Sequence, residues 1–201
     1  MAKSARSKSQ SETRDQRKTQ ILDAARICVR DHGIHAATLN RIAALASMSG
    51  GHVYHFFATK EALMIALCDR DLDDFMMHMS QFTERARVDP GNVAEALSAE
   101  IMAWFSQDRA ALTIEFVAEA GRNPNFLEMV LRNEGRMREA IHSIMGPLLV
   151  GLPEPEIKKR VETLLVMMRG LAGHACTRPK AEYGVLAETF EIVLRGVLTL
   201  K

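Results

Sequence analysis

The sequence predicts an all-α protein of about nine helices, with three in a small N-terminal module and six in a larger body. Ala, Leu and Met are plentiful while aromatic residues make up only 5% of the chain, a composition that favours helices. Apolar residues recur at spacings of three and four along most of the sequence. Gly, Pro and Asn/Asp clusters interrupt this pattern at intervals that suit helices of ordinary length.

At 201 residues, the chain is long enough for a small module and a larger hydrophobic core. We divide it into a flexible basic tail (1–12), a three-helix module (13–60) and a helical body (61–201). Residues 1–60 contain 10 Lys and Arg against 4 Asp and Glu, a net charge of +6, and the remainder contains 16 against 21, a net charge of −5. A basic end joined to an acidic remainder suggests a polyanionic partner at the N-terminal end.

Cysteine usage indicates a reducing compartment. Cys28, Cys68 and Cys176 are odd in number and far apart, unlike a disulfide framework. The first ten residues contain no apolar segment typical of a signal peptide, and no apolar stretch is long enough to span a bilayer. We therefore expect a cytoplasmic protein.

The first helix of the module is predicted to begin with a capping box at Ser9-x-x-Glu12 or at Thr13-x-x-Gln16, and to end at Gly33, a residue that commonly stops a helix. Ile21, Ala24 and Cys28 lie on its inward stripe. A plain core role is the simplest interpretation of Cys28. Lys3, Arg6 and Lys8 of the tail suit either a flexible tail or an arm on phosphates.

Two short helices around a tight turn are predicted next. Leu39, Ile42 and Ala46 share one apolar face, and the Thr38 hydroxyl precedes this face as an N-cap. Residues 47–49 form the turn, in which Met48 is the apolar residue that points into the core.

Ser49 is the N-cap of the helix after the turn, and Val53 and Phe57 hold that helix against the core. The rest of this helix faces outward. Its outward residues offer close backbone approach at two glycines, and hydrogen-bonding groups of different reach at two histidines and a tyrosine; they are Gly50, Gly51, His52, Tyr54 and His55. Such groups suit phosphate oxygens and base edges.

The following helix begins with Thr59 as its N-cap and Lys60 in its first turn. Free N–H groups and a full positive charge at this end suit an anion. These features together predict a helix-turn-helix whose second helix enters the major groove of DNA. The predicted DNA-binding residues are Thr38, Ser49, Gly50, Gly51, His52, Tyr54, His55, Thr59 and Lys60.

This stretch resembles the DNA-binding domain of the TetR (tetracycline repressor-like) family of bacterial regulators. The resemblance is carried by Thr38, Ile42, Ala43, Ala46, Ser47, Met48, Ser49, Gly51, Tyr54, Phe56, Phe57, Lys60 and Leu63. Two residues depart from the family pattern. Ser47 replaces the usual turn glycine, which predicts a non-glycine residue at positive φ at a cost of about 1 kcal/mol. His52 stands where Thr or Ser is commoner.

The resemblance implies a ligand-responsive transcriptional regulator, most simply a homodimeric repressor that binds a pseudo-palindromic operator in double-stranded DNA. A small-molecule effector would bind in the body and release the protein from the operator. Dimerisation also follows from half-site logic, since one short recognition helix contacts too few bases for specificity.

Six body helices are predicted, separated by breaks at 89–91, 122–124, 152–155 and 178–179, with a disturbance at Gly146-Pro147. The last two helices are apolar over broad faces, and Gly170 and Gly173 would let another helix pack closely. These faces form core alone or, as the resemblance implies, a dimeric four-helix interface. The residues predicted for that interface are Val161, Leu164, Leu165, Met168, Phe190, Val193 and Val197.

Candidates for the effector pocket are large or adaptable side chains, whose alternative role is ordinary core. Ten methionines lie between Met64 and Met168, and methionine repacks readily around different ligands. Glu115 and Glu119 are one helical turn apart and would suit a cationic ligand. The residues from Glu115 to Pro124 also loosely resemble the C-terminal domain of the BetI-type branch. The candidates are Phe75, Met79, Trp104, Phe105, Glu115, Phe116, Glu119, Met145 and Met168.

We expect no enzymatic activity, no cofactor and no metal. His32-x-x-His35 and His52-x-x-His55 have helical spacing but no nearby Cys or Glu to complete a tetrahedral set. A helical metal-dependent enzyme is the alternative class, and it predicts activity lost on chelation. A sequence-independent DNA-packaging protein is a third interpretation. It predicts similar affinity for any duplex, whereas a regulator discriminates by roughly 10³ or more.

Overall fold

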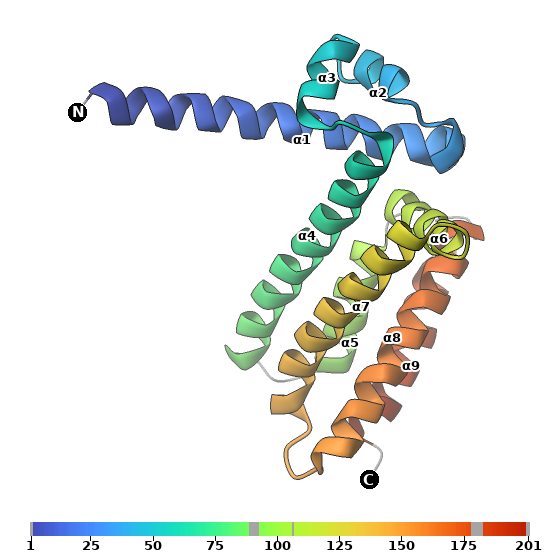
Figure 1. Cartoon of the computed structure of the whole chain (residues 1–201). Helices are drawn as coiled ribbons and strands as arrows, with labels where there is room; N and C mark the ends of the chain where they lie inside the picture. The colour runs from blue at the N-terminus through green and yellow to red at the C-terminus, as the bar shows by residue number, and fades with distance from the viewer. Residues whose placement is uncertain (1, 89–92, 106, 178–182, 200–201) are drawn as a thin grey trace. The chain divides into compact units, whose positions relative to one another are not determined.

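The computed structural model describes residues 2–88, 93–105, 107–177 and 183–199. Over these ranges the chain forms nine α-helices and one short 3-10 helix, with no strand (Figure 1). The predicted all-α class is confirmed. The chain divides into two compact units, residues 1–69 and 70–201.

The first unit contains α1 (Ala2–Ala36), α2 (Leu39–Leu45), α3 (Gly50–Phe56) and the first turns of α4 (Lys60–Val88). Helix α1 begins at Ala2, before both predicted starts at Ser9 and Thr13, because neither Gly nor Pro interrupts the sequence until Gly33. At Gly33 the backbone leaves helical geometry with φ 75° and ψ 164°, so α1 bends at the predicted stop before its last turn. The small core of this unit includes Ile21, Ala25, Cys28, Ile42, Val53 and Leu63.

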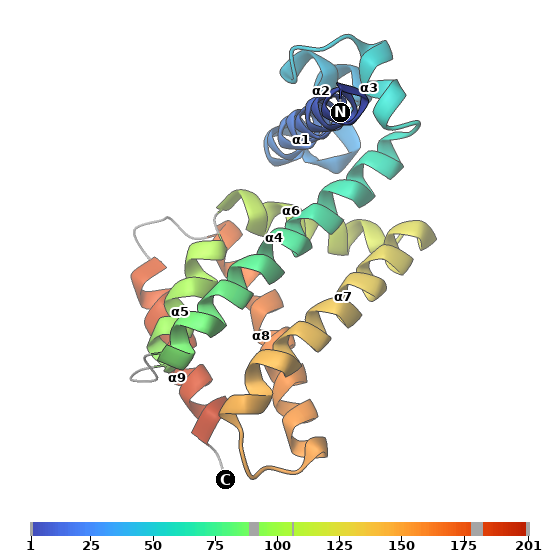
Figure 2. The ribbon, with the colours of Figure 1, turned by 90° about the vertical axis from the view of Figure 1, so that its left-hand side faces the viewer.

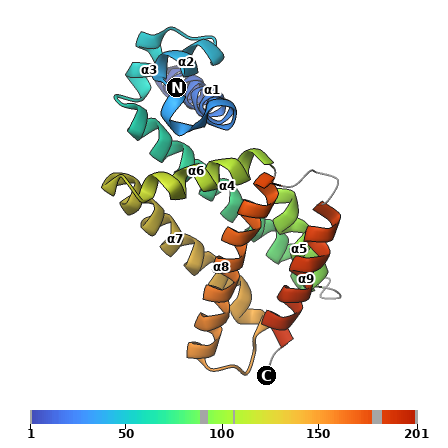
Figure 3. The same cartoon turned by 90° about the vertical axis from the view of Figure 1, so that its right-hand side faces the viewer.

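The second unit contains the rest of α4 together with α5 (Val93–Trp104), α6 (Gln107–Ala120), α7 (Pro124–Met145), α8 (Glu154–Thr177) and α9 (Tyr183–Thr199). Helix α5 packs along α9, α6 crosses α7 and α8, and α8 lies beside α9 (Figure 3). One hydrophobic core runs through α4, α5, α7, α8 and α9.

Helix ends in the body follow the predicted turn signals. The Asn123 side chain accepts a hydrogen bond from the Asn125 N–H, and Pro124 occupies the first turn of α7, where its missing N–H costs nothing. At Gly146-Pro147 α7 tightens into the 3-10 helix η1 (Gly146–Leu148), which leads into the loop before α8 (Figure 2). The predicted breaks at 89–91 and 178–179 lie outside the described residues.

Helix α4 is continuous from the first unit into the second. The predicted domain boundary at residue 60 coincides with its first residue, whereas the compact units divide inside it, between Asp69 and Arg70. Among the described helices, none has the length and apolar character needed to cross a membrane.

Candidate nucleic-acid interface and body cavity

The turn between α2 and α3 is held in an unusual backbone conformation. Ser47 has φ 54° and is the only non-glycine residue with positive φ among the described residues. The Ser47 N–H donates to the Ala44 carbonyl at 3.1 Å, and the Met48 N–H donates to the Ala43 carbonyl at 2.9 Å. The positive φ predicted for Ser47 is therefore confirmed, and Met48 is half-buried beneath the turn.

Three hydroxyls cap the three helices that meet here. Thr38 Oγ1 accepts from the Arg41 N–H at 3.2 Å, Ser49 Oγ accepts from the His52 N–H at 3.2 Å, and Thr59 Oγ1 accepts from the Ala62 N–H at 3.0 Å. Each bond satisfies a backbone donor that the helix start leaves without a partner. All three hydroxyls are thus engaged in positioning the helices.

The outward face of α3 gathers the side chains predicted to contact DNA. Val53 is fully buried and turns the helix so that His52, Tyr54 and His55 are exposed, with Tyr54 at 52%. The His52 and His55 rings each meet the Phe56 ring edge-on, with centroids 5.3 and 5.7 Å apart. Phe56 therefore supports two polar rings at the surface of one short helix.

The two glycines at the start of α3 differ in what surrounds them. A Cβ on Gly50 would lie 2.9 Å from the Asn40 Oδ1, so the absent side chain lets α2 and α3 approach each other. A Cβ on Gly51 would meet no atom within 4 Å. The space over Gly51 is open to an incoming partner, while that over Gly50 is used within the module.

Lys60 lies at the end of α1. Its Nζ donates to the Ile34 carbonyl at 3.1 Å and to the His35 carbonyl at 3.2 Å, and Arg41 Nη1 donates to the Ala36 carbonyl at 3.2 Å. Two cations thus donate to backbone carbonyls at the end of α1, and they oppose its negative dipole. The sequence did not predict the contact of Lys60 with Ile34 and His35, because these residues are separated from it by 26 and 25 positions.

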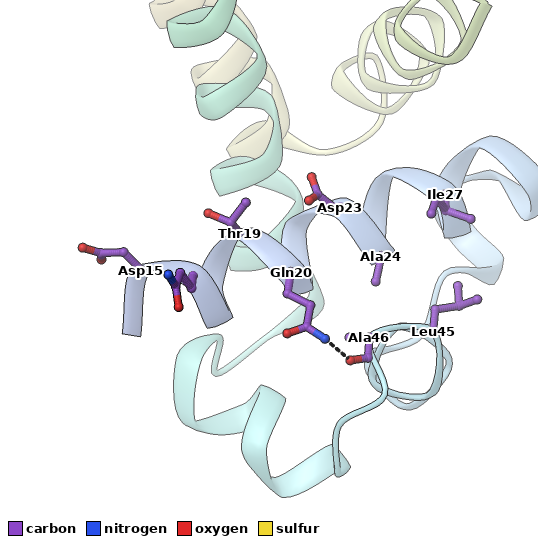
Figure 4. A pocket seen from close by; sticks show the side chains of 9 residues that line it. Asp15, Thr19, Gln20, Asp23, Ala24, Ile27, Leu45 and Ala46 are labelled. Carbon is purple, nitrogen blue, oxygen red and sulfur yellow. Dashed lines mark hydrogen bonds between the residues drawn. The ribbon is translucent and has the colours of Figure 1, made fainter. Parts of the chain in front are cut away.

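A wide groove of about 670 Å³ lies on the same module between α1 and the end of α2 (Figure 4). Across it, Gln20 Nε2 donates to the Ala46 carbonyl at 2.7 Å. Asp15 and Asp23 line the groove beside the exposed Ile27 and Leu45. None of the predicted DNA-binding residues lines it, and its carboxylates are unsuited to phosphate.

The body contains a small cavity of about 20 Å³ between α4, α5, α7 and α8. Four of the nine predicted effector residues line it: Phe75, Met79, Met145 and Met168. Six further residues line the cavity but were not predicted for the effector pocket, because their apolar spacing is that of any core helix. They are Leu97, Ile101, Ala140, Ile141, Ile144 and Leu164.

The other five predicted effector residues do not line this cavity. Phe116 is buried and stacks on Phe126 with ring centroids 6.1 Å apart, and Glu119 pairs with Arg122 at 3.3 Å. Phe105 is buried and Glu115 is half-buried. None of these four lines the cavity.

Trp104, the fifth, is the centre of a separate cluster beside the cavity. The guanidinium carbon of Arg109 stands 3.7 Å from the centre of its ring, and the Phe75 ring meets it edge-on at 5.3 Å. The His78 ring lies 5.9 Å away, and its Nε2 is 2.6 Å from Glu100 Oε2. The polar side chains of this cluster, His78, Glu100 and Arg109, therefore lie against one another or against the indole.

The residues predicted for the dimer interface lie mainly inside the protomer. Val161, Leu164, Leu165, Met168, Phe190 and Val197 are buried in its own core, and Val193 is half-buried. The outer faces of the same helices carry different apolar residues: Val166 on α8 is 69% exposed, and Val185 and Ile192 on α9 are 65% and 72% exposed. A Cβ on Gly170 or Gly173 would meet no atom within 4 Å.

The thiols of the buried Cys28 and the half-buried Cys176 are poor nucleophiles. Burial raises the pKa of Cys28 and of Cys176 above the usual thiol value, which disfavours the reactive thiolate. Within the described ranges, no group of three or more His, Cys, Asp or Glu side chains is arranged to hold a metal ion.

Known proteins resemble both units. Residues 21–67 match the family described as bacterial regulatory proteins, tetR family. The HTH-type transcriptional regulator UidR of Escherichia coli is 26% identical over 185 residues, which cover 90% of this chain and 93% of that protein. The HTH-type transcriptional repressor AcnR of Corynebacterium efficiens is 26% identical over 186 residues, covering 85% and 89%.

Among solved structures, Salmonella enterica GusR superposes with a TM-score of 0.73 at 23% sequence identity. The match covers 91% of this chain and 95% of GusR, so the likeness of fold includes the body as well as the helix-turn-helix. The tetR-family match ends at residue 67, and the BetI-type resemblance of residues 115–124 stays a prediction.

Proposed function

This chain belongs to the TetR family of transcriptional regulators, and we propose that it is a homodimeric repressor that binds a pseudo-palindromic operator and is released by a small-molecule effector. The observation that carries the proposal is the outward face of α3, where His52, Tyr54 and His55 stand exposed on a capped helix. Repression then needs no chemistry, because occupancy of the operator blocks transcription. A regulator of this kind acts in the cytoplasm, where bacterial DNA lies.

Roles can be assigned to the residues of this face from their reach and chemistry. His52 lies in the first turn of α3 and reads a base edge in the major groove. Gly51 allows the backbone to approach the DNA closely, and Tyr54 and His55 donate to phosphate oxygens, which sets the register of the helix on the duplex. Thr38, Ser49 and Thr59 hold α2, α3 and α4 in place through their caps and leave hydroxyl lone pairs toward solvent.

Two copies of α3 are needed for specificity. A twofold dimer would present them to successive major grooves roughly 34 Å apart, which matches an inverted repeat. The outer face of α8 and α9 supports this assembly, since Val166, Val185 and Ile192 expose apolar side chains on neighbouring helices. Burial of such side chains against a second copy is favourable at about 25 cal/mol per Å² of apolar surface.

The proposal is tested by selecting bound duplexes from a random DNA pool. The affinity for the most enriched duplex is then measured at several salt concentrations. We expect an enriched inverted repeat, with affinity at least roughly 10³ above that for unrelated duplex and a steep salt dependence. No enrichment, with uniform weak binding, would favour a DNA-packaging protein instead.

A variant pair sharpens this selection. His52→Ala is expected to relax base preference at one symmetric pair of positions, because the contact to the base edge is lost. His32→Ala, which removes an exposed histidine from α1, is the matched control and should return the wild-type motif. An unaltered motif with His52→Ala would remove His52 from base reading.

A further inference from the structure

The cavity of the body is lined entirely by carbon and sulfur. Phe75 and Met79 of α4, Ile101 of α5, Met145 of α7 and Met168 of α8 surround it, and its lining exposes no polar surface. At about 20 Å³ it has room for little more than one water molecule. A water in such a site would find no hydrogen-bond partner, so the site favours an apolar occupant.

We propose that the effector of this protein is an uncharged, largely hydrocarbon molecule that binds in this cavity. The inference rests on the proposed function, a repressor released by a ligand in its body, and it names the chemical class of that ligand. A charged ligand would lose its hydration in the cavity and gain no partner, which is strongly unfavourable.

The charged and polar side chains around Trp104 do not line the cavity. His78 faces Glu100 at 2.6 Å, and Arg109 covers the Trp104 ring at 3.7 Å. Glu119, on α6, pairs with Arg122 and does not line the cavity. Glu115 and Glu119, the two carboxylates predicted to suit a cationic ligand, are thus not part of the cavity lining.

The lining itself can make room for a ligand larger than the empty volume. Three of its side chains are methionines, which have several rotatable bonds and fill irregular spaces in alternative rotamers. The three are contributed by α4, α7 and α8. A ligand of several carbons would therefore be accommodated by repacking Met79, Met145 and Met168, and it would shift the helices that carry them.

The chain contains an intrinsic fluorescent reporter of ligand binding in the cavity. Trp104 is the single tryptophan of the sequence, and its ring contacts the Phe75 ring at 5.3 Å. Phe75 in turn lines the cavity. An occupant that displaces Phe75 changes the surroundings of Trp104, so intrinsic fluorescence reports binding without a label.

The test uses three probes with one hydrocarbon tail and different head groups: 1-octanol, octanoate and octylammonium. We expect 1-octanol to change Trp104 fluorescence saturably, and the two charged probes to bind at least tenfold more weakly. Equal or tighter binding of either charged probe, or no saturable change with 1-octanol, would overturn the proposal.

A variant locates the binding event. Ala140→Leu places three more carbons into the cavity wall and should weaken 1-octanol binding at least tenfold. Ala118→Leu, at an exposed position of α6, is the matched control and should bind as the wild type does. Unchanged binding by a folded Ala140→Leu protein would place the ligand elsewhere and overturn the proposal. If this variant fails to fold, the head-group series on the wild type still decides.

Release from DNA is measured separately, by the anisotropy of a labelled operator titrated with 1-octanol. Release by 1-octanol, and not by the charged probes, is the expected result. Binding of 1-octanol without release would overturn its class as effector. A failure of the regulator proposal is distinguishable, because no operator would then be selected while the fluorescence titration of the free protein stays interpretable.

Discussion

Hydroxyl side chains around the turn of the helix-turn-helix have two different effects. The hydroxyls of Thr38, Ser49 and Thr59 cap helices and stabilise them. Ser47 instead occupies a left-handed conformation at φ 54°, which an L-residue with a side chain adopts at a cost of about 1–2 kcal/mol. Residues two positions apart in one turn therefore contribute to stability with opposite sign.

Replacement of these two serines tests that contrast. Ser47→Gly should raise the free energy of unfolding by up to about 1 kcal/mol, because glycine adopts positive φ without steric cost while losing some entropy on folding. Ser49→Ala should lower it by about 1 kcal/mol, because the His52 N–H loses its partner. Denaturant titrations measure both. A destabilised Ser47→Gly protein would contradict the assignment of strain.

Lys60 is expected to have two roles, one within the module and one on DNA. Its ammonium donates to the Ile34 and His35 carbonyls at the end of α1, and a third N–H remains available to a phosphate. Lys60→Met should therefore lower the free energy of unfolding by about 1–2 kcal/mol and flatten the salt dependence of operator binding by roughly one charge. Thermal unfolding and affinity at several salt concentrations are the two measurements.

The two effects of Lys60→Met separate its roles. Lys18→Met removes an exposed lysine of α1 and is the control for stability, which should stay near that of the wild type. A destabilised Lys60→Met protein with an unchanged salt dependence would show that Lys60 acts only within the module.

At the scale of single helices, α8 and α9 each have one buried apolar face and single exposed apolar residues away from it. The inner faces, with Leu164, Met168 and Phe190, are buried in the protomer. The outer faces expose Val166 and Ile192, which a monomer would leave in water at a free-energy cost. The proposed dimer would cover these exposed side chains with a second copy of the same helices.

A charge on each outer face is expected to separate the subunits. The double variant Val166→Arg with Ile192→Arg would bury unpaired charges in the proposed interface, so the protein should sediment as a monomer and bind its operator far more weakly. Val150→Arg, at an exposed valine in the loop before α8, is the matched control and should stay dimeric. Dimers of the double variant in analytical ultracentrifugation would place the interface elsewhere.

An ion-pair network joins α7 to α8. Arg138 of α7 donates to Glu162 of α8, and Glu134 accepts from both Arg138 and Arg169. The hydrogen bond from Arg138 lowers the pKa of Glu162 below its ordinary value, and raises that of Arg138. Because the folded pKa of Glu162 is depressed, its stabilising contribution is present above the unfolded pKa of about 4.3 and is lost as pH falls through the folded value.

Glu162→Gln should remove this part of the acid sensitivity. Its thermal midpoint is expected to fall less steeply than that of the wild type as pH drops from about 5 toward 3, and to be slightly lower at neutral pH. Glu188→Gln, at an exposed position of α9, is the control and should keep the wild-type slope. A steeper acid slope in Glu162→Gln would have the wrong sign for this pair.

Across the whole molecule, α4 is the element that belongs to both units. It begins at Lys60 beside the end of α1, and farther along it contributes Phe75 and Met79 to the body cavity. A ligand that shifts α4 in the body thus acts on a helix that starts in the DNA-binding module. Such a ligand releases DNA only if it binds the DNA-free conformer of the protein more tightly than the DNA-bound conformer.

This coupling has a reciprocal consequence. If 1-octanol weakens operator binding by a given factor, saturating operator must weaken 1-octanol binding by the same factor, because the two affinities share one coupling free energy. Fluorescence titrations of Trp104 with and without operator measure it, and a duplex of scrambled sequence is the control. Unequal factors at equilibrium would mean that a second ligand site contributes.

The helix-turn-helix could be predicted almost completely from the sequence, because its determinants are local. The caps at Thr38, Ser49 and Thr59, and the positive φ of Ser47, each depend on residues no more than a few positions apart. Hydroxyl capping and steric restriction of φ act over that range, so neighbouring residues in the sequence specify both the caps and the positive φ. The same holds for the turn at Asn123-Pro124 and the tightening of α7 at Gly146-Pro147.

The contacts between distant residues needed the folded chain. The period of 3.6 marks Val161 and Val166 alike as apolar residues of one helix, but only packing separates the buried side chain from the exposed one. Lys60 on the end of α1, and methionines from three helices around one cavity, likewise join residues far apart in sequence. Such proximity depends on how whole helices pack, which no local pattern encodes, and it separates the exposed apolar side chains of α8 and α9 from those that line the cavity.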